Sequence, residues 1–244
     1  MNVNLYTEEI NDVVIQRGHW AEWERAAVCS CVTRDTGQPN FNCKICNGTG
    51  FRYLQPKRIK VAVTSLNSQL SLETLGFREP GTAYATPTDD CIFGFRDRLR
   101  FPDFKCVFSE VIKWEEGLTS PKTCKIIKEI LFLADEDYEY ELGVDFEISK
   151  DRRHIKWLNE DYKDTLKNKN ISLLYYTEPS YLVQDLLHEL RATLSDRKTT
   201  DFTFRELPKQ YLIKREDFIY NVDSTDEIEE TNEIEYDEDG GITI

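Results

Sequence analysis

The spacing of apolar and polar residues along this chain is mostly that of β-strands. Residues 58–64 alternate polar and apolar side chains as Arg-Ile-Lys-Val-Ala-Val-Thr, and residues 144–148 alternate as Val-Asp-Phe-Glu-Ile. A period of two residues indicates a half-buried strand, because successive side chains of a strand point to opposite faces. Apolar-rich or alternating segments predict further strands at 81–86, 105–114, 124–132, 154–158, 171–177 and 181–187.

Short strands at regular spacing, separated by turns such as Pro80-Gly81, are typical of a sandwich or a barrel. We therefore predict a mainly β protein, a β-barrel or sandwich with an N-terminal zinc-knuckle insertion and an extended C-terminal arm. Val13 to Ile15 followed by Gly18 suggests a short strand and then a turn or bulge. The segment from Leu182 to Leu194 also has leucines at helical spacing, and its secondary structure stays open.

Composition divides the chain into four parts. We expect an N-terminal segment with the knuckle at 1–51, a β-barrel body at 52–194, an extended arm at 195–220 and an acidic tail at 221–244. The arm is predicted because its apolar residues are separated by charged ones: Phe202, Phe204, Leu207, Tyr211, Ile213 and Phe218. The tail has too few apolar residues to offset the conformational entropy of ordering, so we expect disorder, or order only on a partner.

Four of the seven cysteines lie within 18 residues and form the sharpest chemical motif of the sequence. Cys29 and Cys31 are separated by one residue, and Cys43 and Cys46 by two. Two closely spaced thiolate pairs can converge on one tetrahedral zinc ion. The glycines of the Cys46-Asn-Gly-Thr-Gly50 sequence allow the positive φ that a chain needs when it turns closely around a metal.

The predicted metal ligands are therefore Cys29, Cys31, Cys43 and Cys46, holding a structural Zn2+. A site with four protein ligands has no position for a reacting water, which is typical of structural rather than catalytic zinc. The single residue between Cys29 and Cys31 is shorter than the usual spacing. His19 is therefore an alternative ligand, and a disulfide or a metal-free cluster is another alternative.

The net charge of −14 is concentrated in the tail. Residues 221–244 hold ten of the 45 acidic residues and no Lys or Arg, so the rest of the chain has 35 acids against 31 bases, a net charge of −4. A weakly acidic body disfavours sequence-independent binding to duplex nucleic acid as the main role. A basic run near the knuckle leaves a nucleic-acid-binding zinc ribbon as an alternative: Lys44, Arg52, Lys57, Arg58 and Lys60.

The sequence has no recognisable catalytic motif. Its three histidines are His19, His154 and His188, and none belongs to a metal-ligand pair or lies near a nucleophile motif. We therefore predict that the chain is not an enzyme, with a hydrolase whose acids meet only in space as the competing hypothesis. There is no run of about 18 apolar residues that would span a membrane, and no signal peptide pattern, so we expect a protein made in a reducing cytoplasm.

Several segments resemble neck proteins of contractile-tailed bacteriophages. The resemblance lies in Arg17-Gly-His-Trp-Ala-Glu-Trp-Glu24, in Cys46-Asn-Gly-Thr-Gly50, in Pro80–Ala83 and Arg96–Leu99, and in the pattern from Tyr140 to Trp157. Together these segments cover roughly residues 10–190. The acidic tail has no counterpart in the resemblance.

The resemblance implies a head-completion or stopper protein, a β-barrel subunit that forms a homo-oligomeric ring between portal and tail. Its partners would be the portal or adaptor and the tail proteins, with genome DNA only as a passing contact. The implied location is the virion neck, after synthesis in the cytoplasm of the bacterial host. A tail terminator, a baseplate protein or another virion component is the alternative within the same class.

Overall fold

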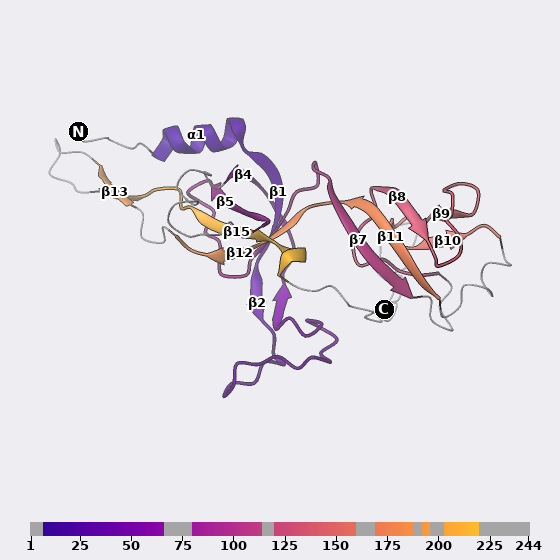
Figure 1. Ribbon diagram of the computed structural model, residues 1–244. Coiled ribbons are helices and arrows are strands. Elements are labelled where there is room, and N and C mark those ends of the chain that lie inside the picture. The colour runs from indigo at the N-terminus through magenta and orange to yellow at the C-terminus, as the bar shows by residue number, and fades with distance from the viewer. Residues whose placement is uncertain are drawn as a thin grey trace, which may run out of the picture.

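The computed structural model describes residues 7–65, 80–113, 120–159, 169–187, 192–195 and 203–219. As predicted, the protein is mainly β and contains a barrel (Figure 1). Six antiparallel strands close it, in the order β1 (His19–Glu24), β4 (Lys57–Ser65), β5 (Thr82–Pro87), β15 (Tyr211–Arg215), β12 (Ser180–Asp185) and β6 (Arg98–Arg100).

The alternating pattern of the strands fills the barrel interior. In β4 the alternation turns Ile59 and Val61 inward, where they are 5% and 0% exposed. Trp23 of β1 pairs in register with Leu99 of β6, and both side chains are buried. The core also contains Ala21, Ala85, Cys91, Phe93, Phe101, Val183, Tyr211 and Ile213.

A second, separate core belongs to a module inserted between β6 and β12 (Figure 1, right-hand side). Its sheet has the order β7 (Cys106–Lys113), β11 (Asn170–Thr177) and β8 (Glu129–Ala134), and a hairpin of β9 (Phe146–Ile148) and β10 (Ile155–Trp157) accompanies it. The alternation of β11 is regular and buries Ile171, Leu173 and Tyr175.

The N-terminal region contains a helix where the sequence predicted a strand. Helix α1 (Thr7–Arg17) includes Val13 to Ile15, and only Val14 of these three is buried. Acidic residues in the first turn and Arg17 in the last turn complement the helix dipole, which offsets the weak helix preference of the β-branched residues. The helix packs against β4 and β5.

Gly18 forms the close turn between α1 and β1. Its N–H donates to the Val14 carbonyl at 2.8 Å, and a Cβ atom at this position would lie 2.3 Å from that oxygen. A residue without a side chain is therefore required where the helix meets the barrel.

The predicted domain boundaries are wrong in three respects. The barrel takes β1 from the segment expected at 1–51 and β15 from the arm expected at 195–220. It also excludes the inserted module, which the sequence placed within one body at 52–194. The alternation of β15 turns Tyr211 and Ile213 into the barrel and the residues between and after them outward. In sequence alone, this alternation looks the same as that of an extended arm.

Most predicted strands are confirmed as β4, β5, β7, β9, β10, β11 and β12. The strand expected at 124–132 begins only at Glu129, because Ile127 packs into the second core from an irregular segment. The open segment after Leu182 is strand as far as Asp185, and Ala192–Ser195 (β13) then pairs with Thr203–Glu206 (β14). The tail at 221–244 and His188 lie outside the described residues.

Candidate metal centre

The four clustered cysteines lie in a finger that projects from the barrel (Figure 1, below the barrel). A two-stranded ribbon carries the finger, with β2 (Ala26–Val28) antiparallel to β3 (Phe51–Tyr53). Val28 is paired with Phe51, so the ribbon brings the chain entering the finger next to the chain leaving it. This pairing places the two cysteine pairs against each other.

The four sulfur atoms all lie within 4.8 Å of one another. The Cys29 and Cys43 sulfurs are 3.8 Å apart, and the Cys31 and Cys46 sulfurs are 3.4 Å apart. Metal–sulfur bonds of about 2.3 Å in a tetrahedron place neighbouring sulfurs about 3.8 Å apart. The four predicted residues therefore come together, and their geometry fits a single tetrahedral ion.

The second cysteine pair is shaped by a tight turn with positive φ angles. The Asn47 N–H donates to the Cys43 carbonyl at 2.8 Å, and the Thr49 N–H donates to the Cys46 carbonyl at 2.9 Å. Asn47, Gly48 and Gly50 have φ values of 49°, 74° and 79°. The glycines of the motif thus take the left-handed conformation for which the sequence singled them out.

The first cysteine pair is held to the end of the same turn. The Cys29 N–H donates to the Gly50 carbonyl at 2.8 Å, and the Val32 N–H donates to the Cys29 carbonyl at 3.0 Å. Cys29 is buried, as is Cys46, whereas Cys31 and Cys43 are half-buried. The backbone therefore fixes both pairs independently of the short spacing between Cys29 and Cys31.

The finger favours one thiolate before any ion binds. Hydrogen bonds from the backbone amides of Cys46 and Ile45 lower the pKa of Cys43 to about 6. Burial raises the pKa of Cys31 to about 12, and hydrogen bonds with the other three thiols act in the same direction. Amides aimed at a sulfur, together with other thiols close to it, are the environment of a metal-binding thiolate.

His19 does not join the cluster. It lies at the start of β1, is exposed, and has its ring against Phe104 with the ring centroids 4.8 Å apart. The other described histidine, His154, contacts Asp151 with 2.6 Å between Nδ1 and Oδ2. Among the described residues, the four cysteines are the one group of three or more metal-ligating side chains brought together.

Sequence reasoning missed the residue that joins the finger to the barrel. Asp97 is 3% exposed, and its carboxylate accepts hydrogen bonds from Trp23 Nε1, from the Ala26 N–H and from the Gly94 N–H, each at 2.8 Å. Ala26 is the first residue of the ribbon, so one buried carboxylate connects β1, the turn before β6 and the base of the finger. The only signal in the sequence was its place in an alternating run of charges.

The charges around Asp97 pair within the fold. Arg98 contacts Glu24 at 3.3 Å and Glu216 at 2.8 Å, and Arg100 contacts Glu22 at 2.8 Å and Glu24 at 3.2 Å. In sequence alone, the run from Arg96 to Arg100 suits a subunit interface as readily as pairing within the fold. The contacts show that Arg98 and Arg100 connect β6 to β1 and to η1 (Glu216–Phe218).

The acidic cluster at 135–137 also has a local role. Burial of Asp135 opposes its ionisation, but hydrogen bonds from the Asp137 and Tyr138 amides and from Lys169 lower its pKa to about 2. A carboxylate held in this way stabilises a turn and keeps its charge at neutral pH. Lys169 Nζ lies 3.2 Å from Asp135 and 3.3 Å from Asp137, so the two carboxylates share one cation.

None of the described helices has the length and apolar character needed to cross a membrane. Comparison of the sequence with models of protein families gives no match, and comparison with curated proteins gives none either.

Proposed function

We propose that the chain is a non-enzymatic structural subunit of a tailed bacteriophage neck, forming a ring between portal and tail. In this role it would help to join head and tail and to retain the genome. It would be made in the bacterial cytoplasm and reside in the virion. A tail terminator or a baseplate protein is the alternative within the same class.

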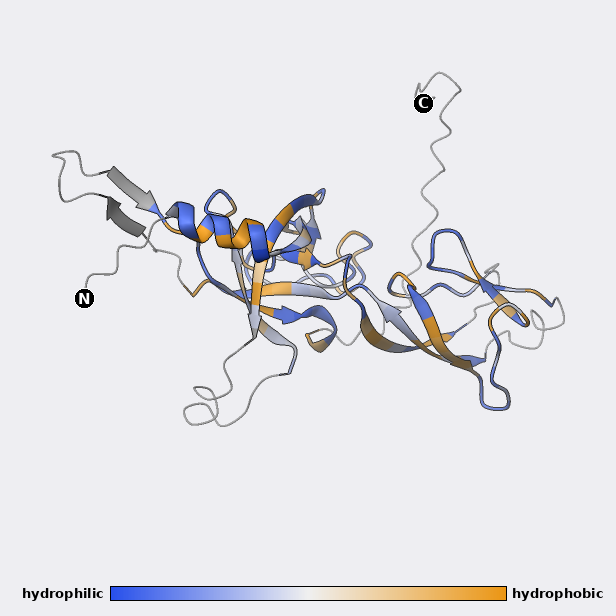
Figure 2. Ribbon diagram, turned by 90° about the horizontal axis from the view of Figure 1, so that it is seen from above, coloured by the Kyte–Doolittle hydropathy of each residue, from blue (hydrophilic) through white to orange (hydrophobic). Residues whose placement is uncertain are grey.

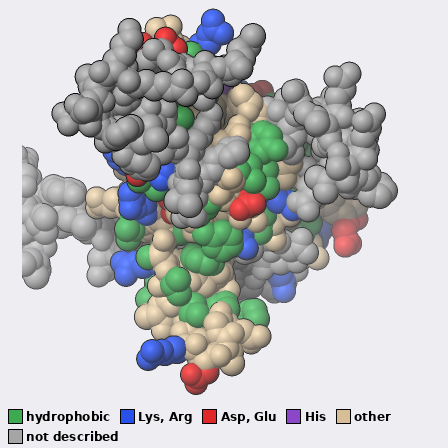
Figure 3. Space-filling view, turned by 90° about the vertical axis from the view of Figure 1, so that its left-hand side faces the viewer, with side chains coloured by type: hydrophobic (Ala, Val, Ile, Leu, Met, Phe, Trp, Pro, Cys, Tyr) green, Lys and Arg blue, Asp and Glu red, His purple; other side chains and the backbone are tan. Residues whose placement is uncertain are grey.

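The observation that carries the assembly role is the exposure of large apolar side chains on both projecting parts of the molecule. Val111 and Phe132 lie on the second module and are 65% and 37% exposed. On the finger, Phe41 and Ile45 are 80% and 61% exposed. Figure 2 marks apolar residues along the strands of the second module, and Figure 3 shows patches of apolar side chains on the part that projects below the barrel. Exposed apolar patches of this kind are typical of surfaces that bind other proteins.

The second part of the proposal is that the ion in the finger is zinc with a structural role. Four thiolates at tetrahedral distances suit Zn2+, and they leave no ligand position for water or substrate. Such an ion would hold the exposed Phe41 and Ile45 in one arrangement for a partner. Metal analysis of purified protein should give one zinc per chain, and the Cys43→Ser variant should lose it.

Light scattering after size exclusion and native mass spectrometry test the assembly role on the full-length chain. We expect oligomers, alone or with the proteins encoded beside it, and we expect Val111→Lys to reduce them. Val144→Lys is the matched control, because Val144 is 63% exposed but lies in a turn outside the sheet. A chain that stays monomeric at all concentrations, with and without those neighbours, would contradict the proposal.

A further inference from the structure

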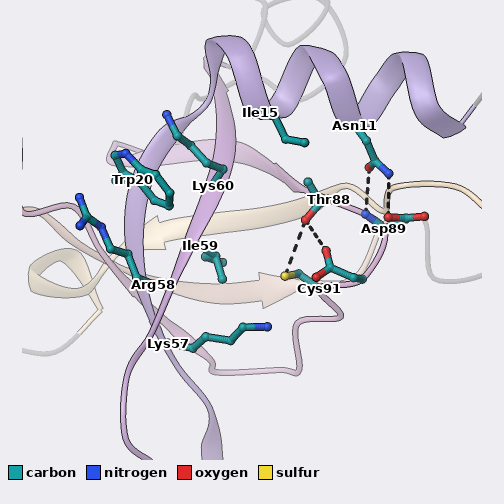
Figure 4. Close-up of a pocket in the computed structure, with 11 residues that line it drawn as sticks. Asn11, Ile15, Trp20, Lys57, Arg58, Ile59, Lys60, Thr88, Asp89 and Cys91 are labelled. Atoms are coloured by element: carbon teal, nitrogen blue, oxygen red, sulfur yellow. Dashed lines mark hydrogen bonds between the residues drawn. The ribbon is translucent and has the colours of Figure 1, made fainter.

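A hollow lies on the outer side of the barrel between α1, β4 and the loop that follows β5 (Figure 4). Its volume is about 410 Å³, and it opens to solvent. Trp20, Arg58 and Lys60 are at one end of the hollow, and Asp89 is at the other end, below the helix. The metal centre plays no part in it.

Trp20 is held between basic side chains. Its side chain is 39% exposed, which is unusual for the largest aromatic residue. The Arg58 guanidinium lies 4.5 Å and the Lys60 ammonium 4.7 Å from the centre of its ring. Lys60 Nζ also donates to the Gly18 carbonyl at 2.9 Å, so this cation is fixed beside the ring.

The basic residues of the hollow have no ion-pair partner in the part of the chain that the structure describes. No described carboxylate lies within 4.0 Å of the charged nitrogens of Lys57, Arg58 or Lys60. The two acids of the hollow accept hydrogen bonds from neutral side chains, and the Thr88 hydrogen bond and the charge of Lys57 both lower the pKa of Asp90. Asp89 exchanges two hydrogen bonds with Asn11, at 2.7 and 3.1 Å, and Asp90 accepts a hydrogen bond from Thr88 at 2.5 Å.

The surrounding chain is basic although the whole protein is acidic. Residues 17–65 contain eight Lys and Arg residues against three acids, whereas the whole chain has a net charge of −14. Two of those three acids, Glu22 and Glu24, are paired with arginines of β6. In β4, Lys57 and Arg58 are exposed and Lys60 is half-buried, so this strand brings positive charge to the hollow.

We propose that this hollow binds single-stranded nucleic acid. The Lys57, Arg58 and Lys60 side chains would contact phosphates, and an unpaired base would stack on Trp20, displacing the exposed Arg58 guanidinium toward the backbone. A positive groove combined with an exposed aromatic ring is the usual arrangement for binding single strands. Paired bases do not offer their faces for stacking, so duplex should bind less tightly. This binding activity goes beyond the neck role and does not depend on it.

The test is fluorescence anisotropy of the full-length protein with a labelled oligothymidylate of about ten nucleotides, over a series of salt concentrations. Trp20→Ala should weaken binding roughly tenfold, and Trp20→Phe should retain most of the affinity. Arg58→Ala with Lys60→Ala should lower the slope of log affinity against log salt by roughly 1.4, because two phosphate contacts are lost.

The matched control is Lys113→Ala with Lys156→Ala, which removes two exposed lysines from the second module and should leave binding unchanged. Circular dichroism of each variant checks that it folds. Absence of binding, binding unaffected by the Trp20 and Arg58 changes, or equal affinity for duplex would overturn the proposal. Binding of a peptide of residues 221–244 in the hollow, without binding of the oligonucleotide, would overturn it in favour of the acidic tail.

Discussion

At the scale of single residues, a buried carboxylate and a few glycines decide how the finger is held. Asp97 connects three segments through its two oxygens, and the turn after Cys46 depends on backbone angles that most residues avoid. Asp97 and the glycines hold the finger through hydrogen-bond and backbone geometry. Substitutions at these positions, each compared with a matched control, measure how much each contributes.

Asp97→Asn should lower the free energy of unfolding by about 2–4 kcal/mol, because an amide NH2 replaces an acceptor that faces buried N–H donors. Urea denaturation followed by tryptophan fluorescence measures the change, since Trp23 donates to this carboxylate. Asp103→Asn is the control, because Asp103 is exposed and should change stability by less than about 0.5 kcal/mol. Equal effects of the two changes would contradict the role assigned to Asp97.

Gly48→Ala should weaken metal binding more than Gly37→Ala does. Both glycines have positive φ, at 74° and 66°, so both substitutions cost about 1–2 kcal/mol of backbone strain. Only at Gly48 would the new Cβ lie close to another atom, 3.1 Å from the Phe41 carbonyl oxygen, whereas nothing lies within 4 Å at Gly37. Competition with a chromophoric chelator measures the two affinities, and equal losses would mean that the close approach has no part.

At the scale of elements, the last described strand matters most, because it closes the barrel. β15 lies between β5 and β12, and it joins residues far apart along the chain. Its apolar residues at every second position fill the barrel core. An arm that docks on a neighbour would give a similar sequence, since either role needs an extended segment with one apolar face.

Ile213→Ala should therefore lower the free energy of unfolding by about 2–5 kcal/mol, the usual cost of a large-to-small change in a core. Leu212→Ala is the control, because Leu212 is next to Ile213 in the strand but its own side chain is only half-buried and faces away from the core. Chemical denaturation of the full-length chain measures both. Two small and equal effects would indicate an arm rather than a barrel strand.

At the scale of the whole molecule, the barrel, the inserted module and the finger each depend on different contacts. The barrel and the module have separate cores, and the finger has the sulfur cluster in place of a core of its own. A structural zinc ion contributes on the order of 10 kcal/mol to the folding of an isolated zinc-finger peptide.

Removal of the metal should therefore loosen the finger more than the barrel. Hydrogen exchange of the chelated protein should rise first between Ala26 and Tyr53, while β11 and β12 stay protected. Cys43→Ser should reproduce this pattern, and Cys91→Ser is the control, because Cys91 is a buried barrel residue outside the cluster. Identical exchange and identical melting with and without metal would argue against a structural ion.

The sequence by itself determined the local features of this protein. Period-two alternation predicted most strands, because the side chains of a strand face alternate sides whatever its partner is. The cysteine spacing predicted which four thiols come together, because the pairs and their glycine turn lie close together along the chain.

Only the tertiary structure decided the features that join distant segments. Alternation shows which face of a strand is buried but not which strands are neighbours, so the closure by β15 and the insertion of the second module were not predictable. The residues that line the hollow beside Trp20 lie up to 80 positions apart in the sequence. The groups that donate hydrogen bonds to Asp97 also include a residue far from it along the chain, Trp23. Such sites exist only after the barrel closes, because closure is what brings their side chains together.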